Sequence, residues 1–141
     1  MPSIEGGGVE KNLFIITNFL TKKCNNVSLI TISKKFSLKF HKSLKFISPK
    51  SNLWDQMSRR LKYLIAIFYL VREILKDKNV IVFSFQANIY CIIVCRIFSI
   101  KVITRSNSAP AGWSKNVIKK IIFKFFLKLS NKIIVNSYEF K

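Results

Sequence analysis

The chain has 141 residues, of which 50% are hydrophobic, and it carries 25 Lys and Arg against 6 Asp and Glu, for a net charge of +19. This hydrophobic content excludes an intrinsically disordered chain and suits a single domain with its own core. The charge favours an anionic partner such as phosphate, a lipid headgroup or nucleic acid, although most of the cations are lysines in an Ile-, Asn- and Phe-rich chain, a mixture that AT-rich coding sequence also produces.

The first predicted helix follows three consecutive glycines. Apolar residues recur at three- and four-residue spacing over 9–23, which predicts a helix with one buried face formed by Leu13, Ile16, Phe19 and Leu20. Glu10 lies in its first turn, where a carboxylate can stabilise the positive end of the helix dipole.

Strands and helices then alternate to the end of the sequence. Short runs rich in β-branched and apolar residues predict strands at 27–32, 44–49, 80–85, 101–104 and 132–137. Helical periodicity predicts helices at 53–76, 87–99 and 114–129. The longest of these helices places an apolar row on one side, made of Leu61, Leu64, Ile65, Phe68, Val71 and Leu75.

This alternation predicts an α/β fold with a Rossmann-like, doubly wound, mostly parallel sheet. The strand at 80–85 is apolar nearly throughout, as expected for a parallel strand that is buried on both faces. Only the segment MPSIE precedes the glycines, which is too short for a buried strand. Because a doubly wound sheet places its first strand at the centre, we expect this sheet to lack that strand.

The cysteines, the single histidine and the apolar runs predict no further specialised chemistry. Cys24, Cys91 and Cys95 lie in apolar surroundings and are expected to be reduced thiols. Cys91 and Cys95, four residues apart on one helical face, are expected to be buried core thiols and not a metal or redox pair. His41 has no second ligand near it in sequence and is expected at the surface. No secretory signal is recognisable, and charged or amide residues interrupt the longest apolar run, so no membrane span is predicted.

Four segments resemble a known family in their order and spacing. They are PSIEGGGVEKNLFIITNFL, VFSFQANIYC, RSNSAPAGW and KIIVNSYEFK. Together they are similar to the N-terminal half of a family 4 glycosyltransferase of the GT-B fold, and the match covers nearly all of 1–141. The resemblance implies a first Rossmann-like domain that faces the acceptor, truncated at both ends, with the donor-binding second domain outside the sequence.

The resemblance also implies a reaction. Members of this family transfer a sugar from a nucleotide donor to a hydroxyl with retention at the anomeric carbon, usually without a metal or another cofactor. We expect the transfer of a hexose or N-acetylhexosamine to a cell-envelope polysaccharide or lipid-linked acceptor, in a bacterial cytoplasm and at the inner face of the membrane. A fragment with half of the site is expected to be inactive on its own. The alternative is a non-catalytic remnant or a basic module that binds a membrane surface.

The glycine loop is the first candidate ligand-binding segment. Gly6, Gly7 and Gly8 match the family loop that faces the cleft between the domains. Their bare N–H groups could approach a diphosphate or a sugar with no Cβ in the way. The alternative is an ordinary tight turn. Because the ligands of parallel sheets bind at the carboxyl ends of the strands, we expect these glycines on the same sheet edge as Arg105.

Polar residues after two predicted strands are the other candidates for binding donor or acceptor. Gln86 and Asn88 follow the strand at 80–85, where many family members present a histidine to the sugar. Either amide could bind a sugar hydroxyl, although Asn88 could equally form a turn or cap a helix. Arg105 and Asn107 match an Arg-x-Asn pattern of one branch of the family, and a guanidinium suits phosphate oxygens. A surface ion pair is the alternative for Arg105. No catalytic residue is assigned.

The last predicted helix is the candidate membrane-facing element. Lys120, Lys124 and Lys128 form a basic stripe beside an apolar row, and Trp113 in the preceding loop offers a flat apolar ring. This composition suits a helix that lies in a membrane interface. The alternatives are a helix that packs its apolar row on the sheet and a tryptophan in the core. Nucleic-acid binding is not expected, because no aromatic platform or recognition-helix motif accompanies the lysines.

Overall fold

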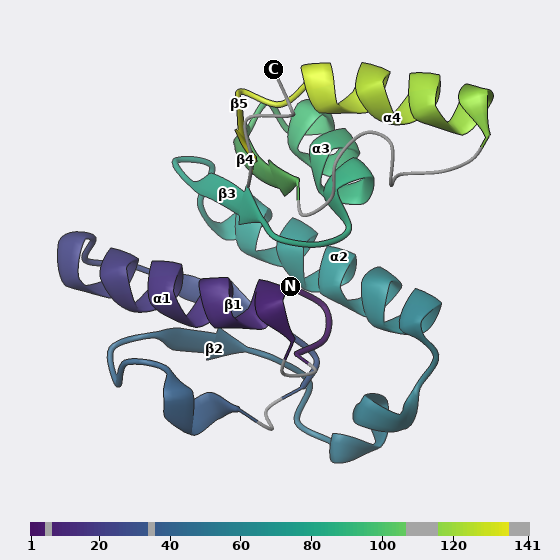
Figure 1. The fold of residues 1–141 in the computed structure, drawn as a ribbon. Coiled ribbons are helices and arrows are strands. Elements are labelled where there is room, and N and C mark those ends of the chain that lie inside the picture. Colours follow the sequence, from purple (N-terminus) through teal and green to yellow (C-terminus); the bar gives the residue numbers. More distant parts are fainter. Residues whose placement is uncertain (5–6, 34–35, 107–115, 136–141) are drawn as a thin grey trace. The chain divides into compact units, whose positions relative to one another are not determined.

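The computed structural model describes residues 1–4, 7–33, 36–106 and 116–135, and it confirms an α/β fold in which all the strand pairs formed by these residues are parallel (Figure 1). The chain divides into two compact units, residues 1–72 and 73–141, which are described in turn.

The described part of the first unit contains one helix, most of a second helix, a two-stranded sheet and two short 3-10 turns. Its elements are α1 (Gly8–Lys23), β1 (Ser28–Ile30), η1 (Ser37–Lys39), β2 (Lys45–Ile47), η2 (Asn52–Gln56) and most of α2 (Arg59–Lys76). Strands β1 and β2 pair with Leu29 opposite Phe46. The connection between them contains η1 in place of a full crossover helix, which a parallel pair permits once the connection has about a dozen residues.

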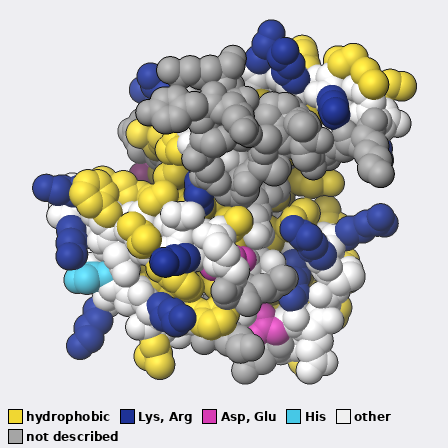
Figure 2. Space-filling view, in the orientation of Figure 1, with side chains coloured by type: hydrophobic (Ala, Val, Ile, Leu, Met, Phe, Trp, Pro, Cys, Tyr) yellow, Lys and Arg dark blue, Asp and Glu magenta, His cyan; other side chains and the backbone are white. Residues whose placement is uncertain are grey.

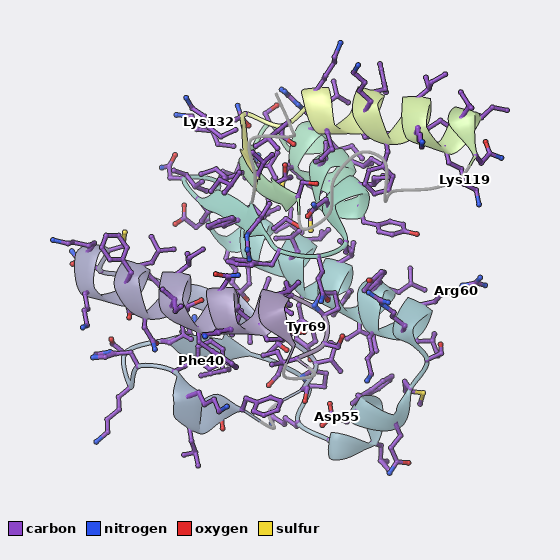
Figure 3. All side chains as sticks on the ribbon, in the orientation of Figure 1. Phe40, Asp55, Arg60, Tyr69, Lys119 and Lys132 are labelled. Atoms are coloured by element: carbon purple, nitrogen blue, oxygen red, sulfur yellow. The ribbon has the colours of Figure 1, made fainter. Side chains whose placement is uncertain are left out.

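Aromatic rings join α1 to the segment that leads into β2. Phe14 of α1 contacts Phe40, labelled in Figure 3, edge to face with 4.9 Å between the ring centroids, and Phe40 contacts Phe46 in the same way at 5.3 Å. The Asn18 side chain accepts a hydrogen bond from the His41 amide and donates one to a backbone carbonyl in η1. His41 itself is exposed, as the sequence predicted.

The first residues run beside the end of β1. The amino group of Met1 donates to the Ile30 carbonyl at 2.8 Å, and the Ile32 amide donates to the Pro2 carbonyl at 3.1 Å. Strand β2 occupies the opposite edge of β1, where the Thr31 amide bonds the Ile47 carbonyl. Residues 1–2 therefore lie where a neighbouring parallel strand would end, although they are not themselves part of a strand.

The second unit consists of two consecutive βαβ units. Its elements are β3 (Ile81–Ser84), α3 (Asn88–Ile97), β4 (Lys101–Ser106), α4 (Val117–Lys128) and β5 (Lys132–Val135), in the sheet order β3-β4-β5. Helix α3 packs on β3 and β4 and also contacts α4 (Figure 1). The central strand β4 is the most buried of the three, and Ile92 and Cys95 of α3 are fully enclosed.

The structure corrects the predicted start of α2. The sequence predicted one helix over 53–76, but α2 begins at Arg59. The Ser51 hydroxyl accepts a hydrogen bond from the Leu53 amide at 3.2 Å and so caps a separate 3-10 turn, η2. A serine cap stabilises the start of whichever turn follows it, and here that turn ends at Gln56.

The structure also corrects the predicted burial of three elements. In α1, Phe19 is exposed, and the buried residues are Glu10, Leu13 and Thr17. Ile81 of β3 is exposed, so β3 is not buried on both faces. On α2 the predicted apolar row is largely exposed, and the opposite row is buried: exposed are Leu61, Leu64, Phe68 and Leu75, and buried are Ala66, Leu70 and Ile74. Because both sides of α2 are apolar, periodicity alone could not identify the packed side.

Among the described residues, none of the helices combines the length and the apolar character that a membrane crossing requires.

Candidate functional site

The carboxyl edge of the three-stranded sheet brings together three of the predicted binding residues. Ser84, the last residue of β3, pairs with Thr104, so β4 extends two residues beyond β3, to Arg105 and Ser106. Helix α3 begins four residues after the end of β3, at Asn88. This is the edge at which parallel α/β sheets bind their ligands, next to a helix N-terminus.

Asn88 links the ends of the two strands. Its Nδ2 donates to the Arg105 carbonyl at 2.8 Å, and its Oδ1 lies 2.8 Å from the Ser84 hydroxyl, which donates to it. The Ser84 hydroxyl also lies 2.7 Å from the Gln86 carbonyl. Both ends of the Asn88 amide therefore have partners within the protein, and this side chain joins the ends of β3 and β4. The prediction that Asn88 caps α3 is wrong, since the N-cap residue is Ala87.

Arg105 places a positive charge inside this edge. The residue is only 4% exposed, and its guanidinium carbon lies 5.7 Å from the centre of the Phe85 ring, within the range of a cation–π interaction. Burial lowers the pKa of Arg105 below its ordinary value, but a guanidinium stays protonated at neutral pH. Because Arg105 is buried, it does not have the surface position that an ordinary surface ion pair requires.

Gln86 presents an acceptor at the same edge. Its Oε1 is buried and has no hydrogen-bond partner in the part of the chain that the structure describes. A buried amide oxygen without a donor costs about 1–3 kcal/mol, so such an atom needs an explanation. A ligand hydroxyl would satisfy it.

The next residue, Ala87, adopts a backbone conformation that alanine rarely takes. Its φ is 56° and its ψ is 32°, in the left-handed region. Strain of this kind persists where the surrounding structure fixes it, and it is frequent at binding sites. Here it lets the chain turn from Gln86 directly into α3.

Relief of this strain gives a first prediction. Ala87→Gly is expected to raise the free energy of unfolding by about 1 kcal/mol, because glycine adopts positive φ without a Cβ clash. Ser99→Gly is the matched control, since Ser99 has φ 58° at the other end of α3. Thermal unfolding should show both variants more stable by about 3 °C. If Ala87→Gly were destabilising while Ser99→Gly stabilised, the assigned strain at Ala87 would be wrong.

The glycine loop lies in the first unit, and the structure describes two of its residues. Gly7 is the N-cap of α1 with φ −83°, so it needs no glycine-specific conformation. A Cβ on Gly7 would lie 3.0 Å from Oε2 of Glu10, whereas nothing lies within 4 Å of a Cβ on Gly8. Glu10 is thus folded back on the start of its own helix, where it meets the positive end of the dipole.

That carboxylate argues against a phosphate bound directly at the start of α1, because like charges repel. The opening at Gly8 leaves room for a neutral group such as a sugar. Gly6 lies outside the described residues. Gly7 and Gly8 belong to a different unit from Arg105, so their shared edge stays a prediction.

Cys91 and Cys95 provide no reactive thiolate at neutral pH. Burial raises the pKa of Cys91, and a hydrogen bond from Ser84 offsets only part of this effect. Burial and the neighbouring Cys91 raise the pKa of Cys95 to about 12. Both thiols therefore stay protonated at neutral pH and are poor nucleophiles or metal ligands. Cys24 is exposed, which corrects the prediction of apolar surroundings. Among the described residues, no three His, Cys, Asp or Glu gather in a group that could hold a metal.

The remaining predicted residues are divided between α4 and the segment before it. Lys124 and Lys128 are exposed on α4, and Lys120 is half-buried. Asn107 and Trp113 lie outside the described residues. Phe85 and Ala87, which also lie at the carboxyl edge of the sheet, were not predicted from the sequence to belong to the site. The end of an apolar strand offered a weak signal for Phe85, and nothing in the sequence marks an alanine for a left-handed conformation.

Comparison with known proteins found no match: no protein-family model matches the chain, and no curated protein sequence matches it.

Proposed function

We propose that this chain is the N-terminal, acceptor-side domain of a retaining glycosyltransferase of the GT-B fold that uses a nucleotide sugar. The transferred group would be a hexose or an N-acetylhexosamine, and the acceptor a cell-envelope polysaccharide or a lipid-linked sugar at the cytoplasmic face of the membrane. The parallel α/β architecture is compatible with this proposal. The observation that carries it is that the carboxyl edge of the sheet holds both a buried cation, Arg105, and a buried acceptor atom, Oε1 of Gln86, which follows the neighbouring strand.

The two side chains suit different parts of a sugar diphosphate. The Gln86 Oε1 can accept a hydrogen bond from a sugar hydroxyl, and the Arg105 guanidinium can donate two parallel hydrogen bonds to phosphate oxygens. During transfer, the bond from the anomeric carbon to the diphosphate breaks, and a bond to the acceptor oxygen forms as the hydroxyl loses its proton. A fixed positive charge stabilises the negative charge that develops on the departing diphosphate. Asn88 holds the two strand ends in place.

The Gln86→Leu variant tests this proposal. Leucine resembles glutamine in size and removes the unpartnered oxygen, so the free energy of unfolding is expected to stay unchanged or to rise. A ligand hydroxyl would lose its acceptor, and affinity for sugar phosphates is expected to fall about tenfold, as for one lost hydrogen bond of about 1.4 kcal/mol.

Isothermal titration calorimetry with UDP-glucose, UDP-N-acetylglucosamine, GDP-mannose and a short-chain prenyl diphosphate sugar measures the affinity, and urea unfolding measures stability. Ser51→Ala, which removes the cap of η2, is the control that should lower stability and leave affinity unchanged. If Gln86→Leu bound every sugar as tightly as the original chain, Gln86 would have no part in a sugar site.

A further inference from the structure

Helix α4 turns an apolar face away from its packed side. Leu127 is buried, whereas five large apolar residues are between 45% and 67% exposed, namely Val117, Ile118, Ile121, Ile122 and Phe125. Their spacing places them on one side of the helix, because a turn of helix contains 3.6 residues. The alternative that this row packs on the sheet is therefore wrong for the described residues, and α4 has an open apolar face of about three turns.

Positive charge borders this face. Lys124 and Lys128 are exposed and, with Ile121 and Phe125, line a shallow hollow on the helix. Lys119, labelled in Figure 3, lies in the first turn of α4. Figure 2 shows hydrophobic and basic side chains side by side over α4, at the top of the view. The sequence contains no acidic residue between Asp77 and Glu139, so no carboxylate of this stretch offsets these charges.

We infer that α4 lies flat on a bilayer that contains anionic lipids, with its exposed apolar face among the acyl chains and its lysines at the phosphate level. A helix of 12 residues is about 18 Å long and can lie in the interface without crossing it. The long lysine side chains extend their amines to the headgroups while their methylene groups stay in the apolar layer.

Charge argues against other occupants of the face. A second copy of the chain, itself of net charge +19, would bring the same α4 lysines to this surface, so self-association through α4 would be opposed by repulsion. Nucleic acid would satisfy the lysines and leave the apolar face in water. An anionic bilayer offers phosphate groups to the lysines and acyl chains to the apolar face. The inference is independent of the proposed function, because it uses no residue of the carboxyl edge.

Vesicle co-sedimentation of the 141-residue chain tests this inference with two pairs of variants. The apolar pair is Ile121→Ser with Phe125→Ser, and its control is Leu64→Ser with Phe68→Ser, which are 64% and 65% exposed on α2. The charge pair is Lys124→Gln with Lys128→Gln, and its control is Lys22→Gln with Lys23→Gln at the exposed end of α1. The vesicles contain phosphatidylcholine alone or a mixture with phosphatidylglycerol. Circular dichroism verifies that each variant is folded.

The chain should bind the mixed vesicles, bind neutral vesicles at least tenfold more weakly, and dissociate as salt rises. At low salt, the partition coefficient of the charge pair should fall about 25-fold, because each lysine contributes about fivefold. The partition coefficient of the apolar pair should fall at least tenfold. The two controls should stay within about twofold of the original chain.

Three results would overturn the inference. They are equal binding to neutral vesicles, equal losses in the controls and the α4 variants, and an apolar-pair variant that changes the oligomeric state in solution without changing vesicle binding. The last result would show that a second copy covers the face. If the apolar-pair substitutions unfolded the chain, vesicle binding of the charge-pair variant alone would test the inference. Both lysines are exposed, so their replacement leaves no cavity.

Discussion

Arg105→Met is expected to weaken the binding of nucleotide sugars and other sugar phosphates by at least 100-fold. The guanidinium is buried at the carboxyl edge, where a charge-assisted pair with phosphate is screened little by water, and the loss of such a pair costs about 2–5 kcal/mol. Methionine keeps most of the length and apolar volume of arginine. Urea unfolding of Arg105→Met, measured alongside the titration, verifies that a loss of affinity is not a loss of folded protein.

Two further variants separate charge, geometry and structure in this test. Arg105→Lys keeps the charge but loses the planar fork, and it should bind about tenfold more weakly than the original chain. Arg96→Met is the matched control, because Arg96 is exposed on α3 and its Nε donates to the Leu129 carbonyl at 2.7 Å. This control should lower stability and leave affinity unchanged. Equal affinities of Arg105→Met and the original chain would remove Arg105 from any phosphate site.

The second large effect concerns turnover: these 141 residues alone are expected to transfer no sugar. In the proposed fold, a second domain holds the nucleoside of the donor while the edge with Arg105 contacts its diphosphate, and transfer requires the donor and acceptor to be held in contact across the cleft between the two domains. Positioning of this kind supplies about 7–11 kcal/mol of a barrier, so half of a site should show no measurable rate. The measurement is radiolabelled transfer from several nucleotide sugars to lipid-linked acceptors.

The comparison is this domain joined to a donor-binding domain of the same fold. It should be active, and Gly7→Val within it should reduce turnover, because a Cβ at Gly7 meets Oε2 of Glu10 at 3.0 Å and displaces the carboxylate from the start of α1. Turnover by the 141 residues alone would contradict the division of the site between two domains.

The positions of the strands could be predicted from the sequence because their signals are local. The segment VIVFSF is β-branched and apolar, and β3 forms at Ile81–Ser84 within it. The packed side of α2 could not be predicted in this way. Leu64 and Leu70 are equally apolar, and only tertiary packing decides that Leu70 is buried and Leu64 exposed. The same holds for α4, whose apolar row was compatible with a sheet contact and with a membrane.

The candidate site was predictable in its location and not in its roles. The rule that parallel strands end at one edge placed Gln86, Asn88 and Arg105 near one another. The role of Asn88 depends on the register that sets Ser84 opposite Thr104, which brings the Arg105 carbonyl within 2.8 Å of the amide. Register is a non-local property, so the sequence left three alternatives for Asn88: a ligand contact, a turn or a helix cap.

The most direct measurement of the proposed site is an NMR titration of the isotopically labelled 141-residue chain with UDP-N-acetylglucosamine and with the short-chain prenyl diphosphate sugar. The amide signals of Ser84, Gln86, Asn88 and Arg105 are expected to shift with one shared, saturable affinity. Arg105→Met should abolish these shifts, and Arg96→Met should retain them. Shifts confined to the lysines of α4, or shifts at the carboxyl edge that persist in Arg105→Met, would contradict a sugar-phosphate site at this edge.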